Sequence, residues 1–557
     1  MAVAITCFGG VGEIGGNKIL VEDGVKRLML DFGMAFGRTG DFFDGVFLTE
    51  RGGRGLLDPL SLGLIPPLRG LMRDDLVPLI AGGGDADQFW QHWQRRFPNA
   101  YRDLRRREPA VDAILTSHAH QDHIADLEYV EADIPLAGTC VTAFISKVLQ
   151  DIGGGSGAAY LQTVVPNGGG VLHSDRSEPS ERRPWYFLDR QPEGAGSEDP
   201  LATPCSFWDC TGSKRRELIP AACNAFDGKI GPWRVKWWPV DHSLPGAVVY
   251  AVETSEGWVA YSGDIRFHGR QGALTWRAAE ELSVLHPVAL LCEGTRLTEP
   301  NVTTEAEVHD NCLRVVQDAA GRLVVADFAP RNIERFEIFA RIADATDRRL
   351  LIQPKDAYLL RAVHLADPSI PDLMESPHIA IYNDPKSVYR QYETAVRQRY
   401  AAIIVSPDTV RRHLGDYILA FSLCDMADLI DLEYLAGRQL NGIYIFSSSP
   451  AHDEEEMVDL LRLWNWTQHL GLLLVGLQPR RDTTGRVIAM EIQPGYHASG
   501  HAGGDELREF VRSVSPQTLI PIHSEAVHLW DQMLDGQPIR IIAPEYAGPV
   551  GQPLIVP

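Results

Sequence analysis

The stretch Leu115–Leu127, LTSHAHQDHIADL, constrains this chain more than any other segment. It follows the apolar run Val111–Leu115, which predicts a buried strand that ends where the polar residues begin. Three histidines and an aspartate share six positions of the loop: His118, His120, Asp122 and His123. Imidazole and carboxylate are ligands that zinc and similar divalent ions take, and this spacing lets one short loop supply two ions. A polar surface loop is the weaker alternative, because such loops rarely hold three histidines.

Composition limits the compartment and the partners. A chain of 557 residues with 45% apolar content has room for about two to four domains. No run approaches the roughly 20 apolar residues that cross a bilayer, and the N-terminus lacks the pattern of a signal peptide. We therefore expect a cytoplasmic protein with no membrane partner. The net charge of −22 argues against broad, nonspecific nucleic-acid binding. A local basic groove could still form at Arg95–Arg107 or Lys214–Arg216, although a solvated helix face explains either segment equally well.

The N-terminal segment predicts a β-meander with strands at Ala2–Phe8, Lys18–Val21 and Arg27–Asp31. Its glycine-rich turn, GGVGEIGGN, leads into a strand and not a helix, so it lacks the helix N-terminus that a dinucleotide pyrophosphate needs. Asp31 ends the third strand and could orient a metal ligand from behind. Residues 35–110 and 152–232 have loop-like composition and are expected to be insertions. The first of them ends in a helix around Ala86–Arg107.

Later segments carry further candidate ligands at strand ends. His242 follows the strand-like Trp233–Pro239, and Asp264 follows WVAYSG. One more imidazole and a carboxylate that can bridge two ions are the parts that the first loop lacks. Near the C-terminus, GYHASGHAGGDELREF is followed by LIPIHSEAVH, in which the strand Thr518–Ile522 delivers His523. Cys205, Cys210 and Cys223 could form another ligand cluster, but ordinary packing is favoured there.

The motifs SHAHQDH, VDHSLPGA, YSGDIRFHG, GYHASGHAGGDEL and LIPIHSE, in this order and after GGVGEIGGN…LDFG, resemble the metallo-β-lactamase fold nucleases of the β-CASP group, and most closely ribonuclease J. The resemblance implies an α/β chain in which a metallo-β-lactamase αββα sandwich carries an inserted β-CASP α/β domain. The sandwich would comprise residues 1–294, with the two insertions, and 486–557. The β-CASP domain would comprise residues 295–485, where alternating helical and strand patterns independently favour a mostly parallel sheet.

The resemblance also implies a role for each motif residue. His118, His120 and His242 would hold one metal ion, and Asp122, His123 and His523 the other, with Asp264 bridging them. Catalytic roles would fall to Asp122, Glu293, His501 and Asp31. Glu293 and His501 match the group's motifs A and B, His523 matches motif C, and Asp31 matches the first lactamase motif. We assign the proton for the leaving ribose oxygen to His501 held by Glu293, because a carboxylate keeps an imidazole charged near neutral pH. Without the resemblance, a helix-capping role for His501 would be favoured.

These assignments predict a metal-dependent ribonuclease, acting 5′-exo or endo through a hydroxide activated by two divalent ions. Zinc is the expected ion, with Mn²⁺ or Mg²⁺ as alternatives, and single-stranded RNA is the expected partner. Its phosphates would be bound by residues that could equally be plain turn residues: Arg331, Asn332, Ser447, Ser448, His497 and Ser499. Glu293 followed by Gly-Thr looks more like the mRNA 3′-end cleavage factors than the aspartate of ribonuclease J, which leaves the mode of cleavage open.

Two other functions remain as alternatives. A DNA nuclease akin to the β-CASP cross-link repair enzymes is disfavoured by His523, because those enzymes generally lack the motif C histidine. A non-catalytic RNA-processing scaffold would show eroded ligands, whereas all seven are present here. The β-CASP insertion disfavours a small-molecule hydrolase of the same fold. The insertions at about 35–110 and 152–232 could cap the cleft, or bind a second copy of the chain or another protein.

Overall fold

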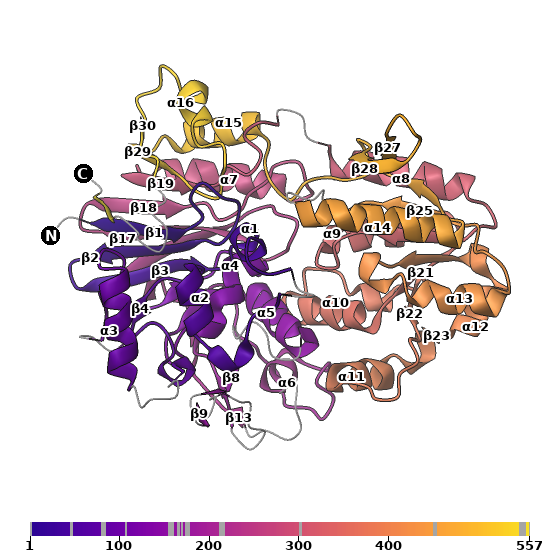
Figure 1. Cartoon of the computed structure of the whole chain (residues 1–557), viewed down its shortest axis with the longest axis horizontal. Coiled ribbons are helices and arrows are strands. Elements are labelled where there is room, and N and C mark those ends of the chain that lie inside the picture. Colours follow the sequence, from indigo (N-terminus) through magenta and orange to yellow (C-terminus); the bar gives the residue numbers. More distant parts are fainter. Residues whose placement is uncertain are drawn as a thin grey trace.

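A computed structural model describes most of the chain as two bodies side by side (Figure 1). The described residues are 3–44, 48–78, 85–105, 109–153, 161–163, 167–168, 171–172, 179–210, 218–299, 303–448, 454–544 and 553–555. The indigo and purple N-terminal half and the yellow C-terminal segment form one body, and the orange middle of the chain forms the other. The chain therefore leaves the first body, builds the second and returns.

The first body is a sandwich of two sheets. One sheet has the strand order β14-β12-β7-β6-β3-β2-β1-β31. Its strands are β1 (Ala4–Gly9), β2 (Lys18–Asp23), β3 (Lys26–Phe32), β6 (Ile114–Leu115), β7 (Leu136–Gly138), β12 (Trp185–Phe187), β14 (Cys223–Ala225) and β31 (Pro553–Ile555). The segment 152–232, expected to be loop-rich, thus contributes β12 and β14 to one edge of this sheet. It also contains β8 (Leu161–Thr163), β9 (Asn167–Gly168), β10 (Val171–Leu172), β11 (Ser180–Arg182), α6 (Pro204–Asp209) and β13 (Leu218–Ile219).

The second sheet is completed by the end of the chain. Its order is β15-β16-β17-β18-β19-β29-β30. Its strands are β15 (Lys229–Ile230), β16 (Trp233–Pro239), β17 (Val248–Thr254), β18 (Gly257–Tyr261), β19 (Ala289–Cys292), β29 (Thr518–Pro521) and β30 (Arg540–Ile541). β19 pairs in parallel with β29, with Ala289 opposite Thr518. This pairing brings the end of β29, and with it His523, beside residues more than 200 positions earlier in the chain.

Apolar side chains from both sheets fill the space between them, and helices cover the outer faces. Ile5, Ile19, Tyr250 and Ile520 belong to one buried cluster between the sheets. The first sheet is flanked by α1 (Phe36–Gly40), α2 (Leu57–Leu62), α3 (Ala86–Arg96) and α5 (Cys140–Gly153), together with the short strands β4 (Leu68–Arg69) and β5 (Arg102–Asp103). The second is covered by α7 (Gly272–Ser283), α15 (Gly504–Val514) and α16 (Leu529–Met533). This arrangement confirms the predicted αββα sandwich.

The second body is built on a fully parallel sheet in the order β23-β22-β21-β24-β20-β25-β26. The strands are β20 (Val324–Asp327), β21 (Arg349–Ile352), β22 (Ile379–Tyr382), β23 (Ile404–Val405), β24 (Tyr417–Ala420), β25 (Ile443–Phe446) and β26 (Leu473–Val475). Its helices are α8 (Glu305–Asp318), α9 (Ile333–Ala345), α10 (Pro354–Ala366), α11 (Gln391–Arg399), α12 (Pro407–Arg412), α13 (Asp428–Ala436) and α14 (Glu454–Leu470). Buried strands alternating with helices confirm the predicted α/β insertion.

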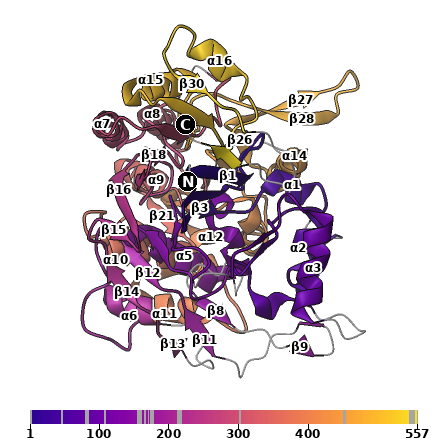
Figure 2. The same ribbon diagram turned by 90° about the vertical axis from the view of Figure 1, so that its left-hand side faces the viewer.

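The two bodies meet through packed side chains on α5 and α10. The Tyr358 hydroxyl on α10 donates to the Asp151 carboxylate on α5 at 2.7 Å, and its ring lies 5.5 Å from the ring of Phe207 on α6. The chain returns to the sandwich through the hairpin β27 (Leu477–Arg481) and β28 (Val487–Ile492), which projects to one side in Figure 2. The two bodies therefore contact each other through packed side chains, and the chain passes between them twice.

Three details bear on the other sequence predictions. The helix predicted at Ala86–Arg107 ends at Arg96, because Pro98 cannot continue it, so the predicted end was wrong. Of the basic segments, Lys214–Arg216 lies outside the described residues, as do positions 106–107, while Arg105 pairs with Asp103 at 2.7 Å. None of the described helices is long and apolar enough to cross a membrane.

Candidate metal centre

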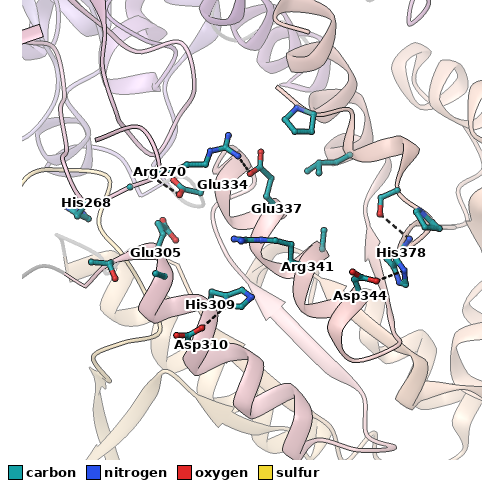
Figure 3. Close-up of a pocket in the computed structure, with 18 residues that line it drawn as sticks. His268, Arg270, Glu305, His309, Asp310, Glu334, Glu337, Arg341, Asp344 and His378 are labelled. Carbon is teal, nitrogen blue, oxygen red and sulfur yellow. Dashed lines mark hydrogen bonds and ion pairs between the residues drawn. The ribbon is translucent and has the colours of Figure 1, made fainter. Parts of the chain in front are cut away.

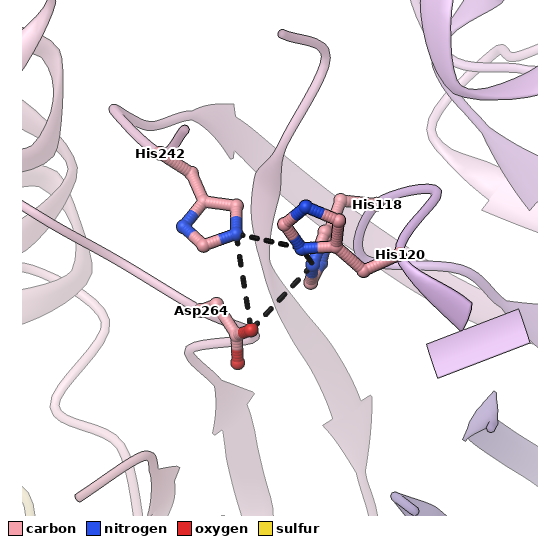
Figure 4. A group of neighbouring side chains, drawn as sticks. All are labelled: His118, His120, His242 and Asp264. Atoms are coloured by element: carbon pink, nitrogen blue, oxygen red, sulfur yellow. Dashed lines mark hydrogen bonds and ion pairs between the residues drawn. The ribbon is translucent and has the colours of Figure 1, made fainter. Parts of the chain in front are cut away.

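Three histidines and one aspartate converge at the end of the sandwich that faces the second body (Figure 4). His118 lies in the loop after β6, and His120 immediately precedes the short helix α4 (Gln121–Ile124). His242 follows β16, and Asp264 follows β18. The Nδ1 atom of His120 lies 2.8 Å from His118 Nε2 and 3.0 Å from His242 Nε2. Asp264 Oδ2 lies 3.5 Å from His118 Nε2. We call this group the first cluster.

A second cluster shares Asp264 with the first and consists of Asp122, His123, Asp264 and His523. His123 Nε2 lies 3.1 Å from Asp264 Oδ2, and His523 Nε2 lies 3.2 Å from Asp122 Oδ2. The distance from His523 Nε2 to Asp264 Oδ1 is 3.7 Å. The seven residues that the sequence singled out as ligands therefore lie together in two adjoining clusters, with Asp264 between them.

In four of the histidines, a hydrogen bond at Nδ1 leaves Nε2 facing the clusters. His123 Nδ1 lies 2.7 Å from Asp31 Oδ2, and His242 Nδ1 lies 2.6 Å from the carbonyl oxygen of Gly500. Because these oxygens accept, each Nδ1 carries the proton and Nε2 presents a lone pair to the cluster. His118 and His523 are held in the same way by hydroxyl groups, at 3.0 and 2.9 Å. Such lone pairs are what a divalent ion requires.

Charge at the site also favours a cation. Burial and the neighbouring imidazoles lower the pKa of His118 and of His242 well below the ordinary value, so both rings are neutral. Burial alone would raise the pKa of Asp264, but the surrounding histidines hold it well below its ordinary value, which keeps the carboxylate charged. Burial likewise opposes a charge on His123, yet Asp264, Asp122 and Asp31 raise its pKa well above the usual range. The carboxylates thus draw positive charge into this space, where a proton and a metal ion compete for the lone pair of His123 Nε2.

Unpaired buried atoms provide a direct test of whether metal ions fit. Within the described part of the chain, Asp264 Oδ1, Asp264 Oδ2 and His123 Nε2 are buried and have no hydrogen-bond partner. Such groups cost free energy unless something pairs with them. All three face the two clusters, and the donors around them are nitrogen and carboxylate oxygen, which suit zinc and similar ions. The residues therefore fit divalent ions.

Asp31 belongs to neither cluster, but its hydrogen bonds position residues of the site. It is fully buried and accepts from the Ser117 amide and hydroxyl, both at 2.7 Å, and from the Tyr261 hydroxyl. Its φ of 54° is in the left-handed region, which a non-glycine residue enters only when its surroundings compensate for the strain. His523 has a φ of 49°. Strained backbone thus occurs at both ends of the site.

The glycine-rich opening turn packs directly against the metal loop. The Gly16 amide donates to the Asp122 carbonyl oxygen at 3.0 Å. A Cβ atom on Gly15 would lie 2.7 Å from the Cβ of Asp122, and one on Gly33 would overlap the Asp122 carbonyl group. Glycine is required at both positions because the backbone must come this close. The turn that resembles a nucleotide-binding loop instead positions Asp122.

Glu293 and His501 form a third group that touches the clusters. His501 Nδ1 lies 2.9 Å from Glu293 Oε2 and 4.0 Å from Asp264 Oδ2. Burial alone would lower the pKa of His501, but the Glu293 and Asp264 carboxylates raise it to about 9. Glu293 is itself fully buried, and its Oε1 accepts from the Ile265 amide at 2.7 Å. Sequence reasoning missed Thr295, whose hydroxyl donates to Glu293 Oε2 at 2.7 Å; its only signal was its place two residues after motif A.

The residues expected to bind phosphate differ in whether their polar atoms already have hydrogen-bond partners. Burial lowers the pKa of Arg331, its Nη1 is buried with no hydrogen-bond partner among the described residues, and the Asp122 charge acts on it. His497 Nε2 is likewise buried and unpaired. In contrast, Asn332 uses its side chain to cap α9, and the Ser447 hydroxyl donates to the carbonyl oxygen of Tyr496. Ser448 is half-buried. The Ser499 hydroxyl accepts from the His501 amide at 3.1 Å.

A separate cavity of about 830 Å³ lies behind the site, between the loop that follows Asp264 and helices α8 and α9 (Figure 3). Its walls carry charged pairs, among them Arg270 with Glu337, and His378 with Asp344 at 2.9 Å. The buried Arg266 joins the two bodies here, because it binds Asp241 of the sandwich and Glu334 of α9 at 3.2 and 2.5 Å. The geometry of the metal loops is thus tied to the second body by ion pairs.

Known proteins match parts of this chain. Residues 486–531 match the family model described as the Zn-dependent metallo-hydrolase RNA specificity domain. Ribonuclease J of Sinorhizobium meliloti is 26% identical over 307 residues, 54% of this chain and 47% of the relative. Ribonuclease J of Mycoplasma pneumoniae is 25% identical over 300 residues, 53% of this chain and 46% of the relative. Each match spans less than half the length of the relative. The likeness to ribonuclease J predicted from the motifs is therefore confirmed.

One solved structure matches over the full length. A crystal structure titled as a protein of unknown function from Enterococcus faecalis V583 covers 100% of both chains, with a TM-score of 0.62 and 19% sequence identity. At this identity the match supports the fold alone. Together with the matches above, it agrees with a metallo-β-lactamase fold that carries a β-CASP insertion.

Proposed function

We propose that this chain is a metal-dependent ribonuclease that hydrolyses RNA phosphodiester bonds. The observation that carries the proposal is the pair of adjoining His/Asp clusters that share Asp264, in a chain whose residues 486–531 match an RNA specificity domain. We further propose that the sandwich comprises residues 1–294 and 486–557, and that residues 295–485 form the β-CASP domain.

Two divalent ions, with zinc as the first choice, would be held by the first and second clusters. When bound, such ions supply Lewis acidity that activates water and offsets the charge of a phosphoryl group. Asp31 and the hydrogen bonds behind the histidines keep the ligand rings oriented. His501 donates from Nδ1 to Glu293, so its Nε2 is the atom that can hold a proton for the leaving ribose oxygen. Binding, orientation and proton donation thus fall to different residues.

Arg331 is proposed to bind substrate phosphate. Its Nη1 atom is buried without a hydrogen-bond partner in the described part of the chain, and its charge acts on His120 and Asp122 of the clusters. A phosphate oxygen would accept a hydrogen bond from this group, whereas Asn332 and Ser447 already have partners within the protein. His497 is a weaker candidate, because its Nδ1 faces the Ser447 carbonyl oxygen and burial lowers its pKa to about 3, which leaves Nε2 without a proton to donate. The chain as a whole is acidic, so phosphate binding depends on a few positions such as Arg331.

The test is cleavage of end-labelled RNA and DNA that carry a 5′-monophosphate, triphosphate or hydroxyl group. Protein supplied with Zn²⁺ or Mn²⁺ is expected to cleave single-stranded RNA, while His120→Ala and Asp122→Ala reduce cleavage to background. His413→Ala, at a site with a 60% exposed side chain on the second body, serves as the matched control. Unchanged cleavage by the two site variants would contradict the proposal.

The same assay separates the alternatives. A ladder from the 5′ end indicates an exonuclease, and internal cuts indicate an endonuclease. Cleavage of DNA in preference to RNA would favour a DNA nuclease. Metal-loaded protein that binds RNA without cleaving it would favour a non-catalytic scaffold. Association with a second copy or another protein through residues 35–110 or 152–232 stays a prediction, which the molar mass in solution would test.

A further inference from the structure

Two buried carboxylates of the site, Asp31 and Glu293, use the same arrangement of atoms. Asp31 Oδ2 binds the Nδ1 of His123 directly at 2.7 Å and the Ser117 hydroxyl at 2.7 Å, and that hydroxyl lies 3.0 Å from His118 Nδ1. A carboxylate therefore reaches one imidazole directly and a second through a hydroxyl group. Asp31 with Ser117 serves one histidine of each cluster in this way.

Glu293 repeats the arrangement on the opposite side. Its Oε2 binds His501 Nδ1 directly at 2.9 Å and accepts from the Thr295 hydroxyl at 2.7 Å. Thr295 Oγ1 in turn lies 2.9 Å from His523 Nδ1 and 3.2 Å from His501 Nδ1. The Thr295 hydroxyl therefore links Glu293 to His523, in the same way that the Ser117 hydroxyl links Asp31 to His118.

The proton count at Thr295 determines the tautomer of His523. A threonine hydroxyl has one proton, and here it is donated to Glu293. Toward His523 the oxygen can therefore only accept, so His523 must carry its proton on Nδ1. His523 Nε2 is then bare, 3.2 Å from Asp122 Oδ2. Two acceptors this close need a proton or a metal ion between them, which is the environment of a metal ligand.

We propose that Thr295 is a positioning residue that fixes the tautomer and orientation of His523 and so controls how tightly the second cluster holds its ion. The proposal rests on the metal centre described under the proposed function. It gives Glu293 a second task, since the carboxylate that holds His501 also anchors the hydroxyl behind His523. Substitution of Glu293 is therefore expected to weaken the second ion as well as the proton donor.

The decisive comparison is Thr295→Val, which removes the hydroxyl with little change in volume, against Thr295→Ser, which keeps it. Metal content after dialysis and titration with Zn²⁺ is expected to give two ions per chain for the unaltered protein and for Thr295→Ser. Thr295→Val is expected to keep the first ion and to bind the second about 10- to 100-fold more weakly, as losses of such outer partners do. Ser117→Ala should instead weaken the ion of the first cluster.

A spectroscopic readout separates positioning from general damage. With ¹⁵N-labelled histidine, the His523 signals of the zinc-free protein should show the proton on Nδ1 in the unaltered protein and in Thr295→Ser. They should show a mixture of tautomers in Thr295→Val and in Thr295→Ala, which also covers the case that the valine variant folds poorly. Circular dichroism checks the fold of each variant.

The outcomes are distinct. Two ions bound with unchanged affinity by Thr295→Val, or an unchanged tautomer, would overturn the role of Thr295 and leave the ribonuclease proposal intact. Unaltered protein that binds no ion would overturn both. Selective loss of the second ion with rescue by serine supports the assignment, whether or not the chain cleaves RNA.

Discussion

Replacing Asp264 with asparagine tests the arrangement of the metal centre most directly. Asp264→Asn keeps the size of the side chain but removes the one charge that both clusters share. Its carboxylate oxygens lie 3.1 Å from His123 Nε2, 3.5 Å from His118 Nε2 and 3.7 Å from His523 Nε2. A ligand in this position contributes to both ions, so its neutralisation should weaken both. Asp122→Asn, in contrast, should weaken only the ion of the second cluster.

The separations set the expected size of the effect. One unit charge about 4 Å from another contributes ~4 kcal/mol at an effective dielectric constant of about 20. Structural relaxation and the entry of water recover part of that loss. We therefore expect the binding free energy of each ion to weaken by at least ~2.8 kcal/mol. That free energy corresponds to a dissociation constant raised about 100-fold.

The assay is metal content after dialysis, with zinc titration and thermal unfolding at matched zinc concentrations. Unaltered protein is expected to hold two ions and to melt at a higher temperature with zinc, because a ligand that binds only the folded state stabilises it. Asp122→Asn should hold one ion, and Asp264→Asn should hold none at zinc concentrations that saturate the unaltered protein. Asp264→Asn with two ions and unchanged affinity would refute the shared-ligand reasoning.

Three other predictions concern the surroundings of the centre. Arg331→Gln is expected to raise the KM for RNA at least about tenfold and to lower the salt dependence of binding by about one phosphate contact, whereas Arg480→Gln on the exposed hairpin should change neither. Arg335→Met should lower the free energy of unfolding by about 1.5–3 kcal/mol, because it removes the partner of the buried Glu305 carboxylate at 3.0 Å while Arg266 stays at 3.3 Å. Denaturant titration measures this, and an unchanged free energy of unfolding would contradict it. Burial raises the pKa of Asp327 to about 7, so the folded state keeps a proton that the unfolded chain releases near pH 4, and stability falls as the pH rises from about 4 to about 7. Asp327→Asn should reduce this pH-dependent loss of stability by up to ~4 kcal/mol. The melting temperature of the variant, measured across this pH range, should therefore depend less on pH.

The sequence alone identified which residue types would meet. Three histidines and an aspartate in one hexapeptide fixed the chemistry as metal binding, since few other roles call for that set at strand ends. The other candidate ligands were named through their motifs, and the clusters contain those residues. Strand and helix patterns also indicated the alternating second body, and in the sandwich the strand-like segment Trp233–Pro239 is β16 with the same bounds. These are local properties, which hydrophobic periodicity and turn chemistry determine within a few residues.

Other features depended on contacts between distant residues, which local patterns do not encode. The end of the helix after Ala86 was misplaced, and β12 and β14 within residues 152–232 were missed because β12 joins the sheet through β7, outside that segment. Thr295 was noticed only as part of the Gly-Thr that follows motif A, because a threonine after a strand is usually a turn residue. Its role follows only from β29 pairing beside β19, which brings His523 within 2.9 Å of its hydroxyl.

The amino-acid sequence by itself therefore indicated the candidate ligands of the hexapeptide, because four side chains on one short loop must remain near one another in any fold. Only the tertiary structure decided that the buried carboxylates Asp31 and Glu293 each serve two histidines. A hydrogen bond is made or lost within a few tenths of an ångström, and the packing of two sheets sets distances on that scale. The tautomer of each ligand is thus a property of the folded chain.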